Sequence, residues 1–211
     1  MKYQIYLFDF DYTLANSEKG IVTCFQHVFT QNGFMNIDDE TIKHTIGLTL
    51  EEAFSQMTGI TDSTVIADYR KQYVAKSDEV MTANTIPYPD TLSTLTTLKE
   101  NEAIVGIIST KYRYRIAVTV EEYGLPVDVV IGGDDVAEAK PDPEGIRKAL
   151  TQFNMSAVNA LYVGDSLVDA QAAYNAGVDF AAVTTGTTTQ EDFQHWPHVA
   201  ILSSLSGVIT L

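Results

Sequence analysis

Apolar and polar positions divide the chain into two kinds of segment. Residues 3–8 form an apolar run with almost no polar interruption, which predicts a central strand of a parallel sheet, buried on both faces. From about residue 16 to 86, apolar residues instead recur at helical spacing, and no convincing strand interrupts them. The second segment is therefore predicted to be a helical insertion.

Capping and stop residues predict four helices in this insertion. The first begins near Ser17 and stops at Asn32-Gly33, and the second runs from Asp38-Asp39 to Ile46. The third runs from 50 to 57 and is capped by Thr49, and the fourth runs from Asp62 or Ser63 towards Ala83.

Helices and strands alternate after the sequence Pro87-Tyr88-Pro89-Asp90. Each proline disfavours helix in the residue before it, so the insertion ends here. The pattern predicts helices at 91–100, 113–123, 143–153 and 167–176, strands at 103–108, 127–131, 160–163, 179–183 and 199–202, and a short terminal helix. Such alternation is typical of an α/β protein with a right-handed, mostly parallel, Rossmann-like sheet. We expect a discontinuous core of residues 1–15 and 88–211, interrupted by an α-helical cap domain at 16–87.

Composition narrows the classes of partner. The chain carries 13 Lys and Arg against 28 Asp and Glu, a net charge of −15, which opposes binding to nucleic acid or to an anionic membrane. An anionic substrate would need local positive charge, from a few placed lysines or a metal ion. The single cysteine, Cys24, fits a reducing compartment and is expected to be a buried, inert thiol. We predict a cytoplasmic monomer or homodimer.

Polar residues recur just beyond four of the predicted strands. Because parallel strands open their carboxyl ends on one edge of the sheet, these residues should converge there. They are Asp9 and Asp11 after 3–8, Ser109-Thr110-Lys111 after 103–108, Lys140 after 127–131, and Asp165 and Asp169 after 160–163.

The converging residues suggest phosphate chemistry. Two carboxylates about 4 Å apart repel by roughly 4 kcal/mol at an effective dielectric near 20, so a hard divalent cation such as Mg²⁺ is expected among them. Lys140 and the Ser109 hydroxyl would then hold phosphoryl oxygens. Asp9 is the candidate nucleophile, and Asp11 is the acid that protonates the leaving alcohol and later activates water.

Each of these residues also has a plainer interpretation. Aspartates favour turns and helix caps, and loop lysines are usually solvated, so joint occurrence rather than any single residue carries the argument. The plainer roles are a turn or cap for Asp9 and Asp11, an N-cap for Ser109-Thr110, a solvated lysine for Lys140, and the first turn of a helix for Asp165 and Asp169.

A basic cluster follows the second of these motifs. Lys111, Arg113 and Arg115 could draw in a substrate carboxylate, but a solvated helix face is the favoured interpretation.

The four motifs, in this order, resemble those of the haloacid dehalogenase superfamily. They are Asp9-Phe10-Asp11-Tyr12-Thr13, Ser109, Lys140-Pro141 and Gly164-Asp165-Ser166-Leu167-Val168-Asp169. The helical insertion resembles the cap-bearing subfamily, which includes phosphoglycolate phosphatases, pyrophosphatases and β-phosphoglucomutases.

The resemblance implies specific roles for these residues. Asp9 would be the nucleophile, Asp11 the acid and base, and Ser109 and Lys140 the phosphoryl contacts. It also implies that Asp9, the main-chain carbonyl of Asp11, and Asp165 bind Mg²⁺, with Asp169 in support.

Departures from the family pattern refine the expectation. Tyr12 replaces a common glycine, so a phenol could enter the cleft, and Asp11 favours phosphoryl transfer over dehalogenation. The Ser109-Thr110-Lys111 motif is most similar to the phosphoglycolate phosphatase branch. Residues 46–50 include no basic side chain, which argues against the mutase branch.

We therefore predict a Mg²⁺-dependent phosphatase of a small phosphorylated metabolite that works through an aspartyl-phosphate, with 2-phosphoglycolate as first candidate. Thr110, Gly47 and Thr49 are predicted to bind substrate, the last two from a cap loop. The alternatives are a pyrophosphatase, a β-phosphoglucomutase-like phosphotransferase, or a non-catalytic protein that binds a phosphorylated ligand.

Overall fold

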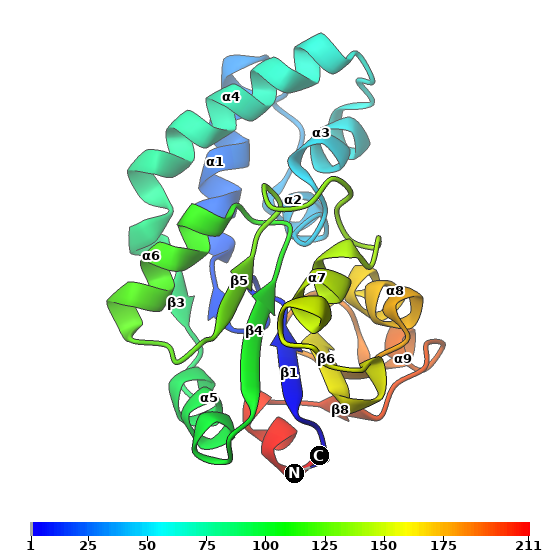
Figure 1. Cartoon of the computed structure of the whole chain (residues 1–211). Helices are drawn as coiled ribbons and strands as arrows, with labels where there is room; N and C mark the ends of the chain where they lie inside the picture. The colour runs from blue at the N-terminus through cyan, green and yellow to red at the C-terminus, as the bar shows by residue number, and fades with distance from the viewer. Residues whose placement is uncertain (1) are drawn as a thin grey trace. The chain divides into compact units, whose positions relative to one another are not determined.

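The computed structural model describes residues 2–211 and divides the chain into two compact units (Figure 1). The core unit comprises the residues up to Ala15 together with Pro87–Leu211, and the helical unit comprises Asn16–Ile86. The chain passes between them through two-residue strands, β2 (Ala15–Asn16) and β3 (Ile86–Pro87), which pair with each other. This ribbon was not predicted from the sequence, because two residues are too few to show a periodic pattern.

The core unit is built on a six-stranded sheet in the order β5-β4-β1-β6-β7-β8, and every neighbouring pair in it is parallel. The predicted α/β fold with a mostly parallel sheet is therefore confirmed. The strands are β1 (Ile5–Phe8), β4 (Ile104–Ile108), β5 (Val129–Ile131), β6 (Ala160–Gly164), β7 (Asp179–Val183) and β8 (Ala200–Leu202).

Helices cover both faces of this sheet. One face packs on α5, α6 and the terminal 3-10 helix, and the other packs on α7, α8 and α9. Their bounds are α5 (Thr91–Glu100), α6 (Arg113–Tyr123), α7 (Glu144–Gln152), α8 (Leu167–Ala176), α9 (Gln190–Phe193), and 3-10 helices at Ala157–Asn159 and Leu205–Thr210.

Strand β1 shows why its sequence is apolar throughout. Tyr6 and Phe8 point into the layer formed with α5 and α6, while Ile5 and Leu7 point into the layer formed with α7 and α8. All four side chains are fully buried. The strand sits between β4 and β6, so its carboxyl end opens at the middle of the sheet edge.

The helical unit contains α1 (Glu18–Gln31), α2 (Asp39–Lys43), α3 (Leu50–Thr58), α4 (Ser63–Val80) and a 3-10 helix at Thr82–Asn84. Asp38, Thr49 and Asp62 accept the predicted capping hydrogen bonds. The expected ends at Ile46 and Ala83 were too late by one turn or less, because the chain tightens into turns and a 3-10 helix there.

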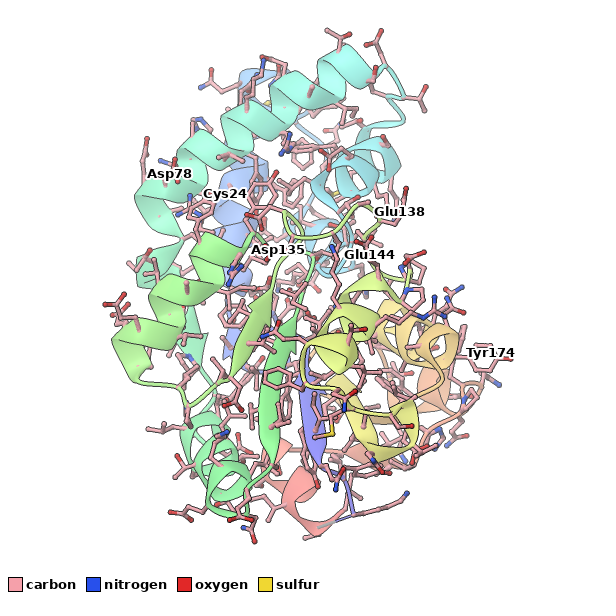
Figure 2. All side chains as sticks on the ribbon, viewed as in Figure 1. Cys24, Asp78, Asp135, Glu138, Glu144 and Tyr174 are labelled. Atoms are coloured by element: carbon pink, nitrogen blue, oxygen red, sulfur yellow. The ribbon has the colours of Figure 1, made fainter. Side chains whose placement is uncertain are left out.

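The interior of the helical unit is aromatic. Phe25, Phe29, Phe54 and Tyr73 pack ring against ring, with centroids 4.8–6.3 Å apart. Cys24 lies in this interior with no exposed surface, as predicted (Figure 2). Across residues 2–211, no helix combines the length and the apolar character needed to cross a membrane.

Candidate active site

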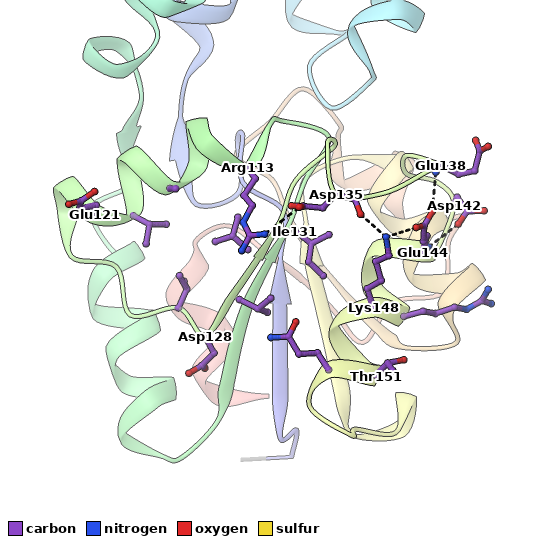
Figure 3. A pocket seen from close by; sticks show the side chains of 17 residues that line it. Arg113, Glu121, Asp128, Ile131, Asp135, Glu138, Asp142, Glu144, Lys148 and Thr151 are labelled. Carbon is purple, nitrogen blue, oxygen red and sulfur yellow. Dashed lines mark hydrogen bonds and ion pairs between the residues drawn. The ribbon is translucent and has the colours of Figure 1, made fainter.

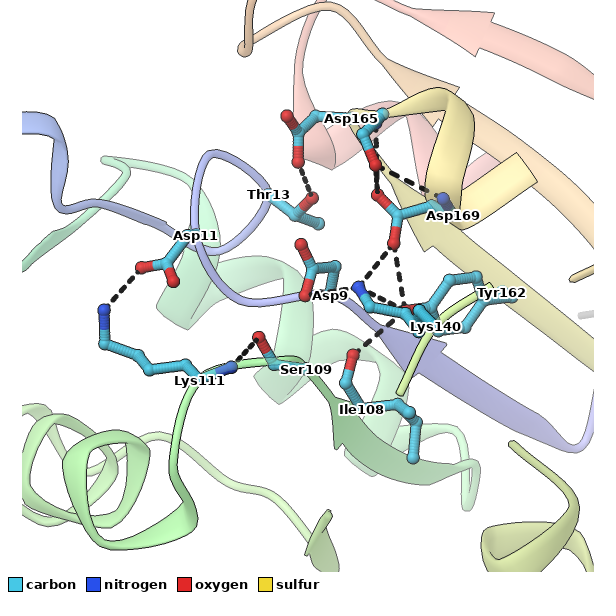
Figure 4. A network of polar contacts seen from close by, with 11 residues as sticks. Asp9, Asp11, Thr13, Ile108, Ser109, Lys111, Lys140, Tyr162, Asp165 and Asp169 are labelled. Atoms are coloured by element: carbon cyan, nitrogen blue, oxygen red, sulfur yellow. Dashed lines mark hydrogen bonds and ion pairs between the residues drawn. The ribbon is translucent and has the colours of Figure 1, made fainter. Parts of the chain in front are cut away.

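The predicted polar residues of the core unit meet at the carboxyl ends of β1, β4 and β6 (Figure 4). Asp9 directly follows β1, and its amide donates to the Val163 carbonyl on β6 at 2.9 Å. On the other side, the amide of Ser109, which directly follows β4, donates to the Ile131 carbonyl on β5 at 3.0 Å. These ladder bonds hold the motif residues on rigid strands rather than on free loops.

Lys140 lies at the centre of one network. Its Nζ is 2.6 Å from Oδ1 of Asp169, 2.9 Å from Oδ1 of Asp9 and 3.2 Å from the Tyr162 hydroxyl. The residue is only 7 % exposed, so the solvated-lysine interpretation is wrong. Protein groups surround this ammonium group, since Asp169 and Tyr162 accept hydrogen bonds from it and Asp9 forms an ion pair with it.

Three aspartates form a compact carboxylate cluster. Asp9, Asp165 and Asp169 are buried, and each offers an oxygen within 4.8 Å of those of the other two. Burial raises the pKa of Asp9 to about 6, against the lowering effect of Lys140. Burial, and then the charges of Asp169 and Asp9, raise the pKa of Asp165 well above its usual value. The cluster therefore carries more negative charge than Lys140 compensates.

Lys140 itself stays charged. Burial acts to lower the pKa of Lys140, but the carboxylates of Asp169 and Asp9 outweigh burial and raise it well above the usual value. A permanent positive charge thus lies beside Asp9.

Asp165 and Asp169 are held in place by hydrogen bonds from neighbouring residues. Ser166 and Asp169 form a capping box at the start of α8, so Asp169 both caps this helix and binds Lys140. Asp165 accepts a hydrogen bond from the Thr13 hydroxyl at 2.9 Å. The capping interpretation of Asp169 is therefore correct but incomplete.

Three further residues support the cluster and were missed in the sequence. Tyr162, inside the apolar run of β6, donates to the Ile108 carbonyl at 2.9 Å. The hydroxyl of Thr185 donates to the carbonyl of Tyr12. Gly186 lies so close to Asp165 that an added Cβ would be 2.0 Å from Oδ2. The Thr- and Gly-rich run after β7 was the available signal for the last two.

Tyr12 occupies the position where the family commonly has glycine. Its φ of 59° lies in the left-handed region that favours glycine. The residue is 4 % exposed. Its phenol is therefore buried rather than displayed on the surface.

A second pair lies at the same edge. Nζ of Lys111 is 2.8 Å from Oδ1 of Asp11, and the two side chains are 9 % and 11 % exposed. In Figure 4 the Asp11 carboxylate points toward Lys111 rather than toward Lys140. The favoured prediction of a solvated Lys111 is wrong, because the lysine folds inward over Phe10 to meet this carboxylate.

Ser109 and Thr110 do not cap the helix that follows them. The N-cap of α6 is Tyr112, while the Ser109 hydroxyl accepts a hydrogen bond from the amide of Lys111 at 3.3 Å. Ser109 is 5 % exposed, and Thr110 is half-buried. A phosphate contact for either residue remains a prediction.

Gly47 and Thr49 belong to the helical unit. Thr49 forms a capping box with Glu52 at the start of α3, and Gly47 has a φ of 105°. Their predicted role in substrate binding remains a prediction.

A groove of about 1040 Å³ runs along the edge strand β5, between α6 and α7 (Figure 3). Its three cations already have protein partners: Arg113 pairs with Asp135 at 3.3 Å, Lys148 pairs with Glu144 at 2.6 Å, and Arg147 donates to the Asn175 carbonyl at 2.9 Å. None of the clustered aspartates lines it. Anion chemistry therefore points to the strand ends rather than to this larger hollow.

Comparisons with known proteins agree with this geometry. The family model of haloacid dehalogenase-like hydrolases matches residues 6–183. A pyrophosphatase PpaX of Bacillus cereus is 32 % identical over 186 residues, 87 % of this chain and 84 % of that protein. A pyrophosphatase PpaX of Listeria monocytogenes is 30 % identical over 210 residues, 97 % of this chain and 94 % of that protein.

Solved structures give the same result. A structure assigned to a haloacid dehalogenase-like hydrolase of Bacteroides fragilis is 50 % identical with a TM-score of 0.96, and covers 98 % of this chain and 100 % of that one. A structure assigned to a phosphoglycolate phosphatase of Lactobacillus plantarum is 26 % identical with a TM-score of 0.88, and covers 100 % of this chain and 99 % of that one.

Proposed function

The chain belongs to the haloacid dehalogenase-like hydrolase family, and from that premise we propose that it is a Mg²⁺-dependent phosphatase of small phosphorylated metabolites. Membership confirms the resemblance inferred from the four motifs, and the names of the relatives confirm the prediction of an enzyme of the phosphatase type. The observation that carries the proposal is the buried contact of Asp9 with Lys140 at 2.9 Å, inside a cluster of three carboxylates.

Asp9 is suited to act as the nucleophile. Its pKa of about 6 leaves the carboxylate ionised at pH 7, and the charge of Lys140 favours that form. In the first step an Asp9 oxygen bonds to phosphorus, the bond from phosphorus to the leaving oxygen breaks, and an aspartyl-phosphate forms. Lys140 orients Asp9 and places positive charge beside the transferring group, which Ser109 and Thr110 contact.

Asp11 serves both steps as acid and base. It gives a proton to the leaving oxygen in the first step. In the second step it accepts a proton from water, the water oxygen bonds to phosphorus, and the bond to Asp9 breaks to release inorganic phosphate. One residue, Phe10, separates the nucleophile and the acid in sequence, so one strand end presents both.

The carboxylate cluster fits a hard divalent cation. Three buried carboxylates lie within 4.8 Å, and burial, together with the charges of the neighbouring aspartates, raises the pKa values of Asp9 and Asp165. Asp9, Asp165 and the main-chain carbonyl of Asp11 would hold Mg²⁺, with Asp169 in support. When bound, the ion supplies charge neutralisation and polarises phosphoryl oxygens.

The first candidate substrate is 2-phosphoglycolate, to which the Ser109-Thr110-Lys111 motif and the Lactobacillus plantarum neighbour point. The second candidate is pyrophosphate, favoured by relatives at 30–32 % identity that are named pyrophosphatases. We assign the helical unit the role of a cap domain that contributes Gly47 and Thr49 to substrate binding, and we place the enzyme in the cytoplasm.

Phosphate release from a substrate panel tests this proposal. The panel contains 2-phosphoglycolate, pyrophosphate, sugar phosphates and nucleotides, each with Mg²⁺ and with chelator. We expect metal-dependent release that Asp9→Asn abolishes, by at least about 10³-fold, since no other carboxylate replaces the covalent step. The control is Asp68→Asn, the same change on an exposed helix position, which should leave release unchanged. Release that persists in Asp9→Asn would refute the nucleophile.

A further inference from the structure

Lys111 is a half-buried lysine whose hydrogen-bonding capacity is mostly unused. Its side chain is 9 % exposed, and its ammonium group bonds Oδ1 of Asp11 at 2.8 Å and lies 5.7 Å from the centre of the Phe10 ring. An ammonium group has three N–H donors. Within residues 2–211, Asp11 is the one acceptor that the Lys111 ammonium meets, so two donors remain for a ligand.

Lys140 provides the contrast at the same sheet edge. Asp169 and Tyr162 accept hydrogen bonds from its ammonium group, and Asp9 forms an ion pair with it at 2.9 Å. A new anion could bind the Lys140 ammonium only by displacing one of these groups. Of the two lysines, Lys111 is therefore the one prepared to accept a further anionic partner.

The position of Lys111 places that partner on the leaving-group side. A proton donor such as Asp11 must lie about 2.6–3.2 Å from the leaving oxygen. Since Lys111 is 2.8 Å from Oδ1 of Asp11, its ammonium group lies within about 6–8 Å of that oxygen, depending on which Asp11 oxygen gives the proton. A carboxylate or phosphate attached one or two bonds from the leaving oxygen spans this distance.

The charge of the site makes such a contact necessary. Four carboxylates gather at this edge, from Asp9, Asp11, Asp165 and Asp169, and the whole chain has a net charge of −15. A leaving group with its own negative charge would be repelled unless a cation met it directly. The nearby Arg113 does not serve, because it is exposed and paired with Asp135.

We propose that Lys111 is a specificity-determining residue that binds a second anionic group of the substrate, so that the enzyme selects phosphoryl compounds whose leaving group carries a carboxylate or phosphate next to the bridging oxygen. The inference rests on the proposed function and narrows its substrate class. In 2-phosphoglycolate the anion would be the carboxylate, and in pyrophosphate the second phosphate.

Paired substrates test this inference. Ethyl phosphate carries a methyl group where 2-phosphoglycolate carries its carboxylate, so the ratio of their kcat/KM values isolates recognition of the second anion. We expect Lys111→Met to lower this ratio by about 10–100-fold, the effect of one charge-assisted hydrogen bond. Lys111→Arg should retain most of the ratio. Pyrophosphate measured against ethyl phosphate forms the second arm and distinguishes a phosphate from a carboxylate.

A matched control and a binding measurement separate the outcomes. Arg113→Met removes an exposed charge two residues away and should leave the ratio unchanged. In the Asp9→Asn background, calorimetry should show weaker binding of the preferred substrate when Lys111→Met is added. Lys111→Gln is the second neutral variant should Lys111→Met fail to fold.

Failure of the inference about Lys111 can be distinguished from failure of the proposed function. If the parent enzyme hydrolyses these compounds but Lys111→Met or Lys111→Gln keeps the ratio in both arms, the inference about Lys111 is overturned while the proposed function stands. If the parent enzyme with Mg²⁺ hydrolyses none of them, both are overturned.

Discussion

Two lysines at one edge of the sheet differ in how completely the protein uses them. Lys140 is buried and Lys111 is half-buried, and each pairs with an aspartate of the first motif, Asp9 or Asp11. Lys140 has three protein partners, whereas Lys111 has one carboxylate oxygen and the face of Phe10. The burial of a lysine therefore does not by itself define its role. The number of its N–H donors that remain available to a ligand does.

The difference predicts opposite energetic behaviour. In a saturated network, loss of one member leaves buried charges without partners, and the penalty appears in folding. In an unsaturated pair, the open donors are available to a ligand, and the penalty appears in specificity. The following predictions test this contrast, from the largest expected effect on free energy to the smallest.

Lys140→Met should destabilise the protein most. It leaves Asp9 and Asp169 buried without their cation, which typically costs about 3–5 kcal/mol of unfolding free energy. Lys111→Met is the matched control and should cost less than half as much, because a single ion pair is lost at a site with some solvent access. Guanidinium unfolding of the metal-free proteins measures both values. Equal costs for the two variants would contradict the contrast.

Gly186→Ala should weaken Mg²⁺ binding by about 10–100-fold, the usual effect of disturbing a group that orients a ligand. A Cβ at this position would be 2.0 Å from Oδ2 of Asp165, so the carboxylate must move. Titration calorimetry measures the affinity, with Thr188→Ala in the same loop as the control. An unchanged affinity in Gly186→Ala would show that Asp165 is not held for a cation.

Much of this site could be predicted from the sequence, because rigid strands place it. The apolar runs located the strands, and parallel strands bring the residues that follow them to one edge. Asp9, Lys140, Asp165 and Asp169 were found in this way.

The parts that could not be predicted depend on side-chain direction and close approach. The sequence favoured a solvated Lys111, and only the structure shows that its side chain turns inward to Asp11. Tyr162 was indistinguishable from a packing residue in an apolar strand. Gly186 matters through a contact with Asp165, 21 positions earlier, which no periodic pattern reports. The paired strands at Ala15–Asn16 and Ile86–Pro87 were too short to predict.

Asp165→Asn should stabilise the metal-free protein near neutral pH. The folded pKa values of Asp9, about 6, and of Asp165 are raised above the unfolded value of 3.8. As pH rises from about 4, the folded state therefore binds more protons than the unfolded state, and the free energy of unfolding of the protein decreases. Removing one charge should raise the unfolding free energy at pH 7.5 by about 1–2 kcal/mol, roughly 2–8 °C in Tm.

The pH dependence and Mg²⁺ distinguish this effect from simple repacking. The advantage of Asp165→Asn should shrink as the pH falls towards 4 and disappear below the unfolded pKa of 3.8, where the carboxyl is protonated in both states. Mg²⁺ should raise the Tm of the parent at pH 7.5 and raise that of Asp165→Asn much less. An advantage that is the same at pH 4 and pH 7.5 would rule out charge repulsion as its cause.

Tyr162→Phe tests the edge of the saturated network with the smallest change, the loss of one hydroxyl. That hydroxyl donates to the Ile108 carbonyl at 2.9 Å and accepts from Lys140 at 3.2 Å, so its removal should cost about 1–2 kcal/mol of unfolding free energy. Tyr6→Phe is the matched control on the adjacent strand β1, because its buried hydroxyl meets no hydrogen-bond partner among residues 2–211 and its loss should be neutral or stabilising. Lys140 keeps Asp9 and Asp169 in Tyr162→Phe, so kcat/KM should fall by no more than a few-fold. Equal stability of the two variants in guanidinium unfolding would mean that the carboxylates alone fix Lys140, and that Tyr162 serves the network by packing rather than by its hydroxyl.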